Sequence, residues 1–338
     1  MFTIAARYGI HFIFVSLISL LVVLSMNPEL ITNVLPNVEQ GSLQNLKMVW
    51  ISIILEAMPF ILLGVFVSSI MQVFVSDEMV RRFVPKNPIL GIAFGSLLGV
   101  LFPICECGMI PIVRRLIQKG MPTYIGVIFI IVGPIFNPVV YTATYLAFRT
   151  RPEIVYTRMG LALIVGAVIG YILYKVVREN PLRHSVNTLY NDTSMGNHTH
   201  TRPGGRFSAI LEHAAGESFD MGKYLMFGAA VTALVQTFVS RESLAQIGQN
   251  EWSSSLFMMG FAYILSICST SDAFVAASFG TTFPGTALLA FLVFGPMLDF
   301  KSTLMLLSVF RAKFVLLLSV LIAVTVLVGA VIIGSIFL

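Results

Sequence analysis

The two halves of the chain carry the same pattern of polar residues and helix breakers, and this repetition constrains the fold more than any other feature. Offsets of 162 to 164 residues bring polar residues that are stranded in apolar surroundings into register. The aligned pairs include Glu56 with Asp220, Gly64 with Gly228, Gln72 with Gln236, Cys105 with Cys268, Gly133-Pro134 with Gly295-Pro296, and Asn137 with Asp299. Halves that share buried polar groups usually build one site at their interface. We therefore expect the functional site where the two halves meet.

Apolar side chains dominate the composition. Hydrophobic residues make up 57% of the 338 positions and charged residues only 11%, so long apolar stretches predict a polytopic membrane protein. The net charge of +5 does not indicate nucleic-acid binding, because the basic residues lie at the ends of apolar segments. Phosphate-loop, catalytic-triad, nicotinamide and His-Glu-x-x-His motifs are absent from the sequence. We expect neither an enzyme nor a cofactor.

The distribution of lysine and arginine predicts the topology. If all nine apolar segments cross the membrane, the basic residues divide ten against ten, which contradicts the usual cytoplasmic excess. If residues 88–119 and 254–282 instead enter and leave on the same side, fifteen of the 21 become cytoplasmic and Lys301 lies within a helix. The residues left outside are Lys47, Arg149, Arg151, Arg158 and Arg241. This predicts an all-α polytopic membrane protein with about seven full spans, two re-entrant hairpins of broken helix, and two halves of opposite orientation.

Four regions follow from this topology. Residues 1–44 form an additional N-terminal helix, near residues 10–26, and an outer loop, and residues 45–178 form the first membrane repeat. Residues 179–208 form a polar cytoplasmic linker, and residues 209–338 form the second repeat. The linker contains alternate histidines at His198 and His200, which fit either a metal-sensing role or a polar linker without one.

Each expected hairpin tip carries cysteine. In the first tip, Cys105 and Cys107 flank Glu106, and a helix starting near Gly108 points its positive end at the thiols. Paired thiols in such a position can bind a soft metal or metalloid, with Cys268 of the second tip as a third ligand. The alternative is that the cysteines are ordinary small residues of a membrane interior.

Other polar residues extend this candidate site. Ser269, Thr270 and Asp272 belong to the second tip, where they either bind the solute or cap a short helix from Ala273. Asn137 and Asp299 follow the two Gly-Pro breaks and are candidate walls of a solute cavity. Lys301 lies two positions after Asp299, a spacing that predicts no salt bridge on a helix.

Glu56 is the candidate for proton coupling. It lies inside an apolar span, and an ionised side chain near the bilayer midplane normally faces a partner, water or a transported cation. A carboxylate in that position can also carry a proton between the two sides of the membrane.

Four segments resemble the bacterial predicted-permease family that contains the ArsP organoarsenical exporters. They are Phe102 to Leu116, Lys119 to Pro122, Asn137-Pro138, and Cys268 to Phe274, and the resemblance spans roughly residues 45–338. It implies a multi-pass permease of the plasma (inner) membrane, without a cofactor, in which Cys105, Cys107 and Cys268 contact trivalent arsenic. Glu106 and the Ser-Thr-Ser-Asp tip make the chain similar to a subgroup linked to zinc supply. That subgroup implies a small membrane partner protein, and a homo-oligomer is the other candidate assembly.

The sequence is compatible with three functions. The leading one is a secondary-type permease that moves an organoarsenical or a transition-metal ion by alternating access, coupled to protons. The second is a thiol-disulfide electron relay across the membrane, because each half supplies a cysteine. The third is an oxyanion permease that uses the serine-rich tip and the helix N-termini.

Overall fold

The computed structural model describes residues 40–74, 76–85, 87–101, 105–177, 181–182, 206–238 and 251–337. In these ranges the chain forms helices, together with one isolated bridge between Leu182 and Phe310. Four helical segments there are long and apolar enough to cross a membrane, Gln44–Met71, Pro152–Val176, Gly285–Val309 and Ala312–Phe337. The all-α membrane class is therefore confirmed. The N-terminal helix expected near residues 10–26 and nearly all of the histidine-containing linker lie outside the described residues.

The helices follow one another in two series. The first series is α3 (Gln40–Phe74), α4 (Asp77–Phe83), α5 (Pro88–Leu101), α6 (Glu106–Gln118), α7 (Thr123–Val132), α8 (Pro138–Ala147) and α9 (Pro152–Val176). The second series is α11 (Arg206–Phe238), α12 (Glu251–Leu265), α13 (Asp272–Ser278), α14 (Gly285–Met297), α15 (Phe300–Val309) and α16 (Ala312–Phe337). The helix that follows each hairpin begins at Thr123 and at Gly285, 162 residues apart. The breaks in the two series thus fall at matching positions.

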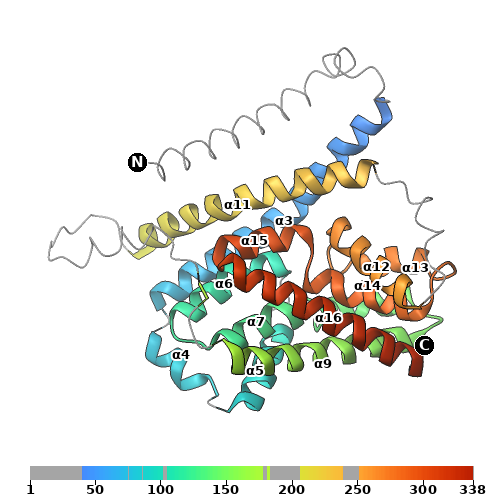
Figure 1. Cartoon of the computed structure of the whole chain (residues 1–338). Helices are drawn as coiled ribbons and strands as arrows, with labels where there is room; N and C mark the ends of the chain where they lie inside the picture. The colour runs from blue at the N-terminus through green and yellow to red at the C-terminus, as the bar shows by residue number, and fades with distance from the viewer. Residues whose placement is uncertain are drawn as a thin grey trace, which may run out of the picture.

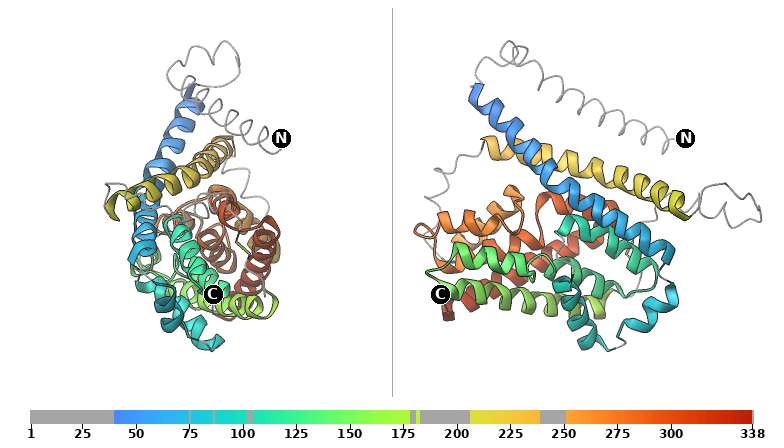
Figure 2. Two further views of the ribbon diagram at one scale, coloured as in Figure 1. Left: turned by 90° about the vertical axis from the view of Figure 1, so that its left-hand side faces the viewer. Right: turned by 180° about the vertical axis from the view of Figure 1, so that it is seen from behind.

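Long helices cover one side of a bundle of shorter ones. Helices α3 and α11 pack against each other along this side and run in opposite directions (Figures 1 and 2). Helices α9 and α16 also pack together and run in opposite directions (Figure 1). The core is built around α7 and α14, in which every residue of Tyr124–Val132 and of Thr286–Met297 is buried. The two central helices occupy equivalent places in the two series.

Two helix pairs are too short to cross a bilayer. At about 1.5 Å per residue, the 14 residues of α5 and the 13 of α6 each reach about 20 Å, against a hydrocarbon core of about 30 Å. The 15 residues of α12 reach about 22 Å and the 7 of α13 about 10 Å. The pairs overlap the segments 88–119 and 254–282, for which re-entrant hairpins stay a prediction.

Proline and polar caps fix the central breaks. Pro296 lies in the last turn of α14, and a proline in a helix removes one hydrogen bond and favours an end there. Asn137 caps α8, where its side chain accepts a hydrogen bond from the N–H of Val139 at 2.9 Å. Asp299 caps α15 through a reciprocal capping box with Ser302. The two residues expected to follow the breaks therefore start the next helices.

Close packing of α3 on α6 depends on a glycine pair. A Cβ added at Gly64 would overlap the backbone carbonyl of Gly108, three residues after Cys105. We expect Gly64→Val to push α6 away from α3, at about 1–3 kcal/mol for overpacking. Gly160→Val is the matched control, because a Cβ at Gly160 meets nothing within 4 Å. The folded fraction, measured by size-exclusion chromatography of detergent-solubilised fusions during heating, should fall only for Gly64→Val. Equal melting of the two variants would contradict this contact.

Candidate functional site

The first hairpin tip places two thiols at the start of a helix. Helix α6 begins at Glu106, two residues earlier than expected, with Cys105 as its N-cap in an extended conformation. Cys107 is therefore the second helical residue rather than part of an irregular tip. The thiols of Cys105 and Cys107 lie within hydrogen-bonding reach of each other, and that of Cys105 also reaches the N–H of Gly108. The positive end of the 13-residue helix faces this pair.

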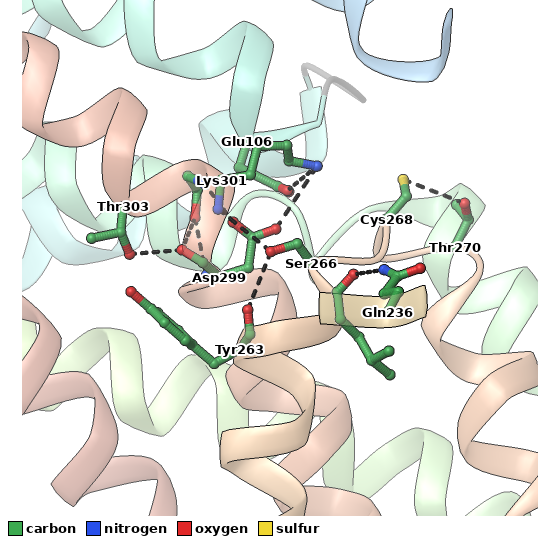
Figure 3. Close-up of polar contacts among 11 residues, drawn as sticks. Glu106, Gln236, Tyr263, Ser266, Cys268, Thr270, Asp299, Lys301 and Thr303 are labelled. Atoms are coloured by element: carbon green, nitrogen blue, oxygen red, sulfur yellow. Dashed lines mark hydrogen bonds and ion pairs between the residues drawn. The ribbon is translucent and has the colours of Figure 1, made fainter. Parts of the chain in front are cut away.

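A buried group of three ionisable residues, Glu106, Asp299 and Lys301, includes the first residue of α6 (Figure 3). The ammonium of Lys301 lies 3.9 Å from Oε1 of Glu106 and 3.8 Å from Oδ2 of Asp299. The three side chains are only 8%, 5% and 1% exposed, in the order Lys301, Glu106 and Asp299. The two-residue spacing of Lys301 and Asp299 predicts at most a loose pair and no salt bridge, and the observed 3.8 Å separation is a long ion pair. Asp299 is the N-cap of α15 and not an interior helical residue. The expectation that side chains two positions apart on a regular helix point in different directions therefore does not apply to it.

The second hairpin tip contacts this charged group through Ser266. Its hydroxyl accepts a hydrogen bond from the N–H of Lys301 at 3.4 Å and donates one to the carbonyl of Tyr263 at 3.2 Å. Ser266 has φ of +46°, a left-handed conformation that is uncommon for a residue with a side chain. From α11, the Gln236 amide donates to the carbonyl of Leu265 (Figure 3). The end of α12 is thereby fixed next to α15.

Cys268 lies on the same tip, close to the first hairpin. The hydroxyl of Thr270 donates to its sulfur at 3.6 Å, and the thiol lies within electrostatic range of Glu106 and Glu56. Cys268 is partly buried, and Glu56 is exposed on α3. Within the described ranges, no three His, Cys, Asp or Glu side chains are grouped so as to hold a metal ion. A three-cysteine metal centre therefore stays a prediction.

The carboxylate of Asp272 binds a buried arginine. Nη2 of Arg158 lies 2.7 Å from Oδ2 of Asp272 and donates to the carbonyl of Ser269 at 3.3 Å. Nη1 donates to the hydroxyl of Thr144 at 2.7 Å. The Arg158 side chain is 0% exposed.

The positions of both residues differ in detail from the sequence analysis. Arg158, counted there with the basic residues on the outer side, is the buried seventh residue of α9, about 9 Å into the helix. Asp272 does not cap a helix from Ala273. The N-cap is Ser271, and Asp272 is the first residue of α13.

The structure thus divides the expected site residues into two groups. Cys105, Glu106, Cys107 and Asp299 surround Lys301, with Cys268 and Thr270 on the adjoining tip. Ser269 and Asp272 surround Arg158. Asn137 caps α8, the helix that carries Thr144.

Sequence reasoning missed the two basic residues at the centres of these groups, Lys301 and Arg158. A signal was available for both. A basic residue inside an apolar helix normally has a buried acidic partner.

The Arg158–Asp272 pair provides a test of this geometry. Asp272→Asn should leave a fully buried guanidinium without its counter-charge, which costs about 3–5 kcal/mol. We expect a clear fall in the melting temperature of the purified protein, measured by intrinsic fluorescence in detergent. Arg149→Gln, which removes an exposed charge near the start of α9, is the control and should melt like the wild type. Equal melting of Asp272→Asn and the wild type would show that the pair is not formed.

Two known proteins are similar to this chain over most of its length. A Bacillus subtilis protein named UPF0718 protein YcgR is 47% identical over 86% of this chain and 97% of its own length. A Streptococcus mutans protein named putative two-component membrane permease complex subunit is 38% identical over 79% of this chain and 88% of its own length.

A third relative matches about a third of the chain, and a family model matches most of it. UPF0718 protein MJ0584 of Methanocaldococcus jannaschii is 24% identical over 36% of this chain and 32% of its own length. No solved structure matches the chain. The model of the family described as "Predicted permease" matches residues 42–335. The chain therefore belongs to this family of membrane permeases.

Proposed function

We propose that the chain moves a thiol-seeking metal or metalloid solute, an organoarsenical or a transition-metal ion, across the plasma membrane. The observation that carries this proposal is that the paired thiols of Cys105 and Cys107 lie within electrostatic range of the buried Lys301 ammonium, which also pairs with Glu106 and Asp299. Sulfur and carboxylate oxygen together suit borderline and soft ions. A charged group of this kind inside an apolar protein is costly, so its presence favours a functional role.

Alternating access by two inverted halves is the proposed mechanism. Its support is the matching position of the breaks in the two helix series and the opposite directions of α3 and α11 and of α9 and α16 (Figure 1). The short pairs α5–α6 and α12–α13 then act as re-entrant hairpins within a topology of seven spans. Irregular backbone at membrane depth is tolerated only where protein or a cavity surrounds it. Residues 266–271, between α12 and α13, form such a segment, and Ser266 at its start contacts the backbone of Lys301.

The proposed solute contacts come from both tips. Cys105, Cys107 and Glu106 supply the first set, and Cys268 and Thr270 complete it when the halves move together. Asp299 lines the site beside Lys301.

Three residues have a supporting part in this proposal. Asn137, Ser269 and Asp272 hold the helix ends that border the pathway. Glu56 is exposed on α3 within electrostatic range of Cys268, which makes it the proposed proton carrier.

Two observations favour this function over its alternatives. Helix α6 and helix α13 each begin with a carboxylate, Glu106 and Asp272, where an oxyanion permease would bind its negatively charged solute. An electron relay between the halves would need a disulfide from Cys268 to Cys105 or Cys107, and all three cysteines are free thiols. An electron relay therefore has less support than a permease.

A second membrane protein is the proposed partner. The support for it is the name of the Streptococcus mutans relative, which describes a subunit of a two-component complex.

Replacement of the thiols tests the proposal. In membrane vesicles, Cys105→Ser combined with Cys107→Ser should reduce transport of Zn²⁺ or of a trivalent organoarsenical by about 10–100-fold, because serine cannot supply a thiolate ligand. Adding Cys268→Ser should reduce it further. Ser335→Ala, an exposed change near the end of α16, is the control. Transport of both solutes at the wild-type rate in the triple variant would refute the proposed substrate class.

A further inference from the structure

We infer that Lys301 is a tethered counter-cation of the permease site, and that the solute is a cation whose charge replaces the Lys301 ammonium beside Glu106 and Asp299. This inference rests on the proposed function, because it assigns the charge class of the solute at the same site. It narrows the candidates from metals and metalloids of any charge to cations.

The distances indicate that Lys301 is held loosely. Its ammonium lies 3.9 and 3.8 Å from the two nearest carboxylate oxygens, beyond the range of about 2.7–3.2 Å for a hydrogen bond. The other buried pair, Arg158 with Asp272, has a contact of 2.7 Å with two further hydrogen bonds to the arginine. Arg158 therefore has a fixed structural contact, whereas Lys301 is attracted to its partners without being bonded to them. A loosely held cation is one that a solute can displace.

Two carboxylate oxygens remain available at the site. Oε2 of Glu106 and Oδ2 of Asp299 have no hydrogen-bond partner, although these residues are only 4% and 1% exposed. A buried oxygen without a donor is unfavourable, and a bound cation satisfies it, whereas an anion or a neutral solute that has no hydrogen-bond donor does not. Two carboxyl groups face one ammonium, so a divalent cation can balance both groups in their ionised form once the ammonium has moved. The thiols of Cys105 and Cys107 lie within electrostatic range of the same ammonium and can add soft ligands.

The backbone of Lys301 stays in place while its side chain can move. A Cβ added at Gly228 would lie 3.4 Å from Cα of Lys301, so α11 packs closely on α15 at this residue. The hydroxyl of Ser266 also holds the backbone N–H of Lys301. A lysine side chain has a flexible stem and a compact ammonium, in contrast to the rigid fork of arginine. Displacement can therefore occur by rotation of the side chain alone.

Zinc binding to purified protein tests the inference. Lys301→Met removes the competing charge and should lower the dissociation constant for Zn²⁺ by about tenfold or more, because a unit charge near 4 Å has a strong effect in a partly buried site. It should also slow Zn²⁺ transport in vesicles, because the site no longer has a counter-cation when empty. Lys301→Arg keeps the charge and should not bind Zn²⁺ more tightly than the wild type. Lys313→Met, an exposed lysine at the start of α16, is the matched control for loss of one charge.

The outcomes separate this inference from the proposed function. If Lys301→Met binds Zn²⁺ no more tightly than the wild type while the cysteine variants lose transport, the inference is wrong and the proposed function stands. If the cysteine variants transport normally, the proposed function fails whatever Lys301 does.

A measurement on the wild type covers the case in which Lys301→Met does not fold. Zn²⁺ should increase acetylation of Lys301 by acetic anhydride at least threefold relative to Lys313, as measured by mass spectrometry. Unchanged acetylation of Lys301 would overturn the inference.

Discussion

A charge buried in an apolar protein needs a partner, and this constraint determines how the two halves of the chain meet. Each hairpin tip carries one buried carboxylate, and each carboxylate is paired with a basic residue from the other half. Glu106 of the first tip is paired with Lys301 of α15, and Asp272 of the second tip is paired with Arg158 of α9. Neither half can be moved alone without separating opposite charges in a medium where they are strongly attracted. The two pairs therefore couple the position of each tip to the opposite half.

The two ion pairs differ in how closely their atoms approach, and this difference indicates different roles for them. Arg158 contacts Asp272, Thr144 and the carbonyl of Ser269 at hydrogen-bonding distances, which fixes the second tip to α8 and α9. The Lys301 ammonium has no contact closer than 3.8 Å with either carboxylate, so the first tip is the less constrained of the two. The thiols of Cys105 and Cys107 lie on that less constrained tip. The proposed solute site requires groups that can rearrange, and the Lys301 side chain is such a group.

Local patterns in the sequence predict local structure well here. The helix pairs at 88–119 and 254–282, the breaks after the Gly-Pro motifs and the clustering of cysteine with Glu106 follow from hydrophobicity, proline and cap chemistry. Pairing between distant segments is different, because nothing in a helical period indicates which buried acid a basic residue will contact. Arg158 and Asp272 are 114 residues apart in the sequence, and the lysine and arginine count uses Arg158 only to orient the chain. The spacing of Lys301 and Asp299 argues against a salt bridge only within one regular helix, and Asp299 instead caps α15.

Asn137 and Asp299 are aligned helix caps that differ in charge. Asn137 and Asp299 follow equivalent breaks, and each uses Oδ1 to accept a hydrogen bond from the start of the next helix. Either residue type serves this purpose about equally, so capping alone does not require a carboxylate. The helix cap therefore does not need the second oxygen of Asp299, Oδ2. This oxygen is the one that lies nearest to the Lys301 ammonium. A buried negative charge that the helix does not need is unfavourable unless a cation is present. At these two aligned positions, Asp299 therefore provides both a helix cap and an ion pair with Lys301, whereas Asn137 provides an uncharged cap.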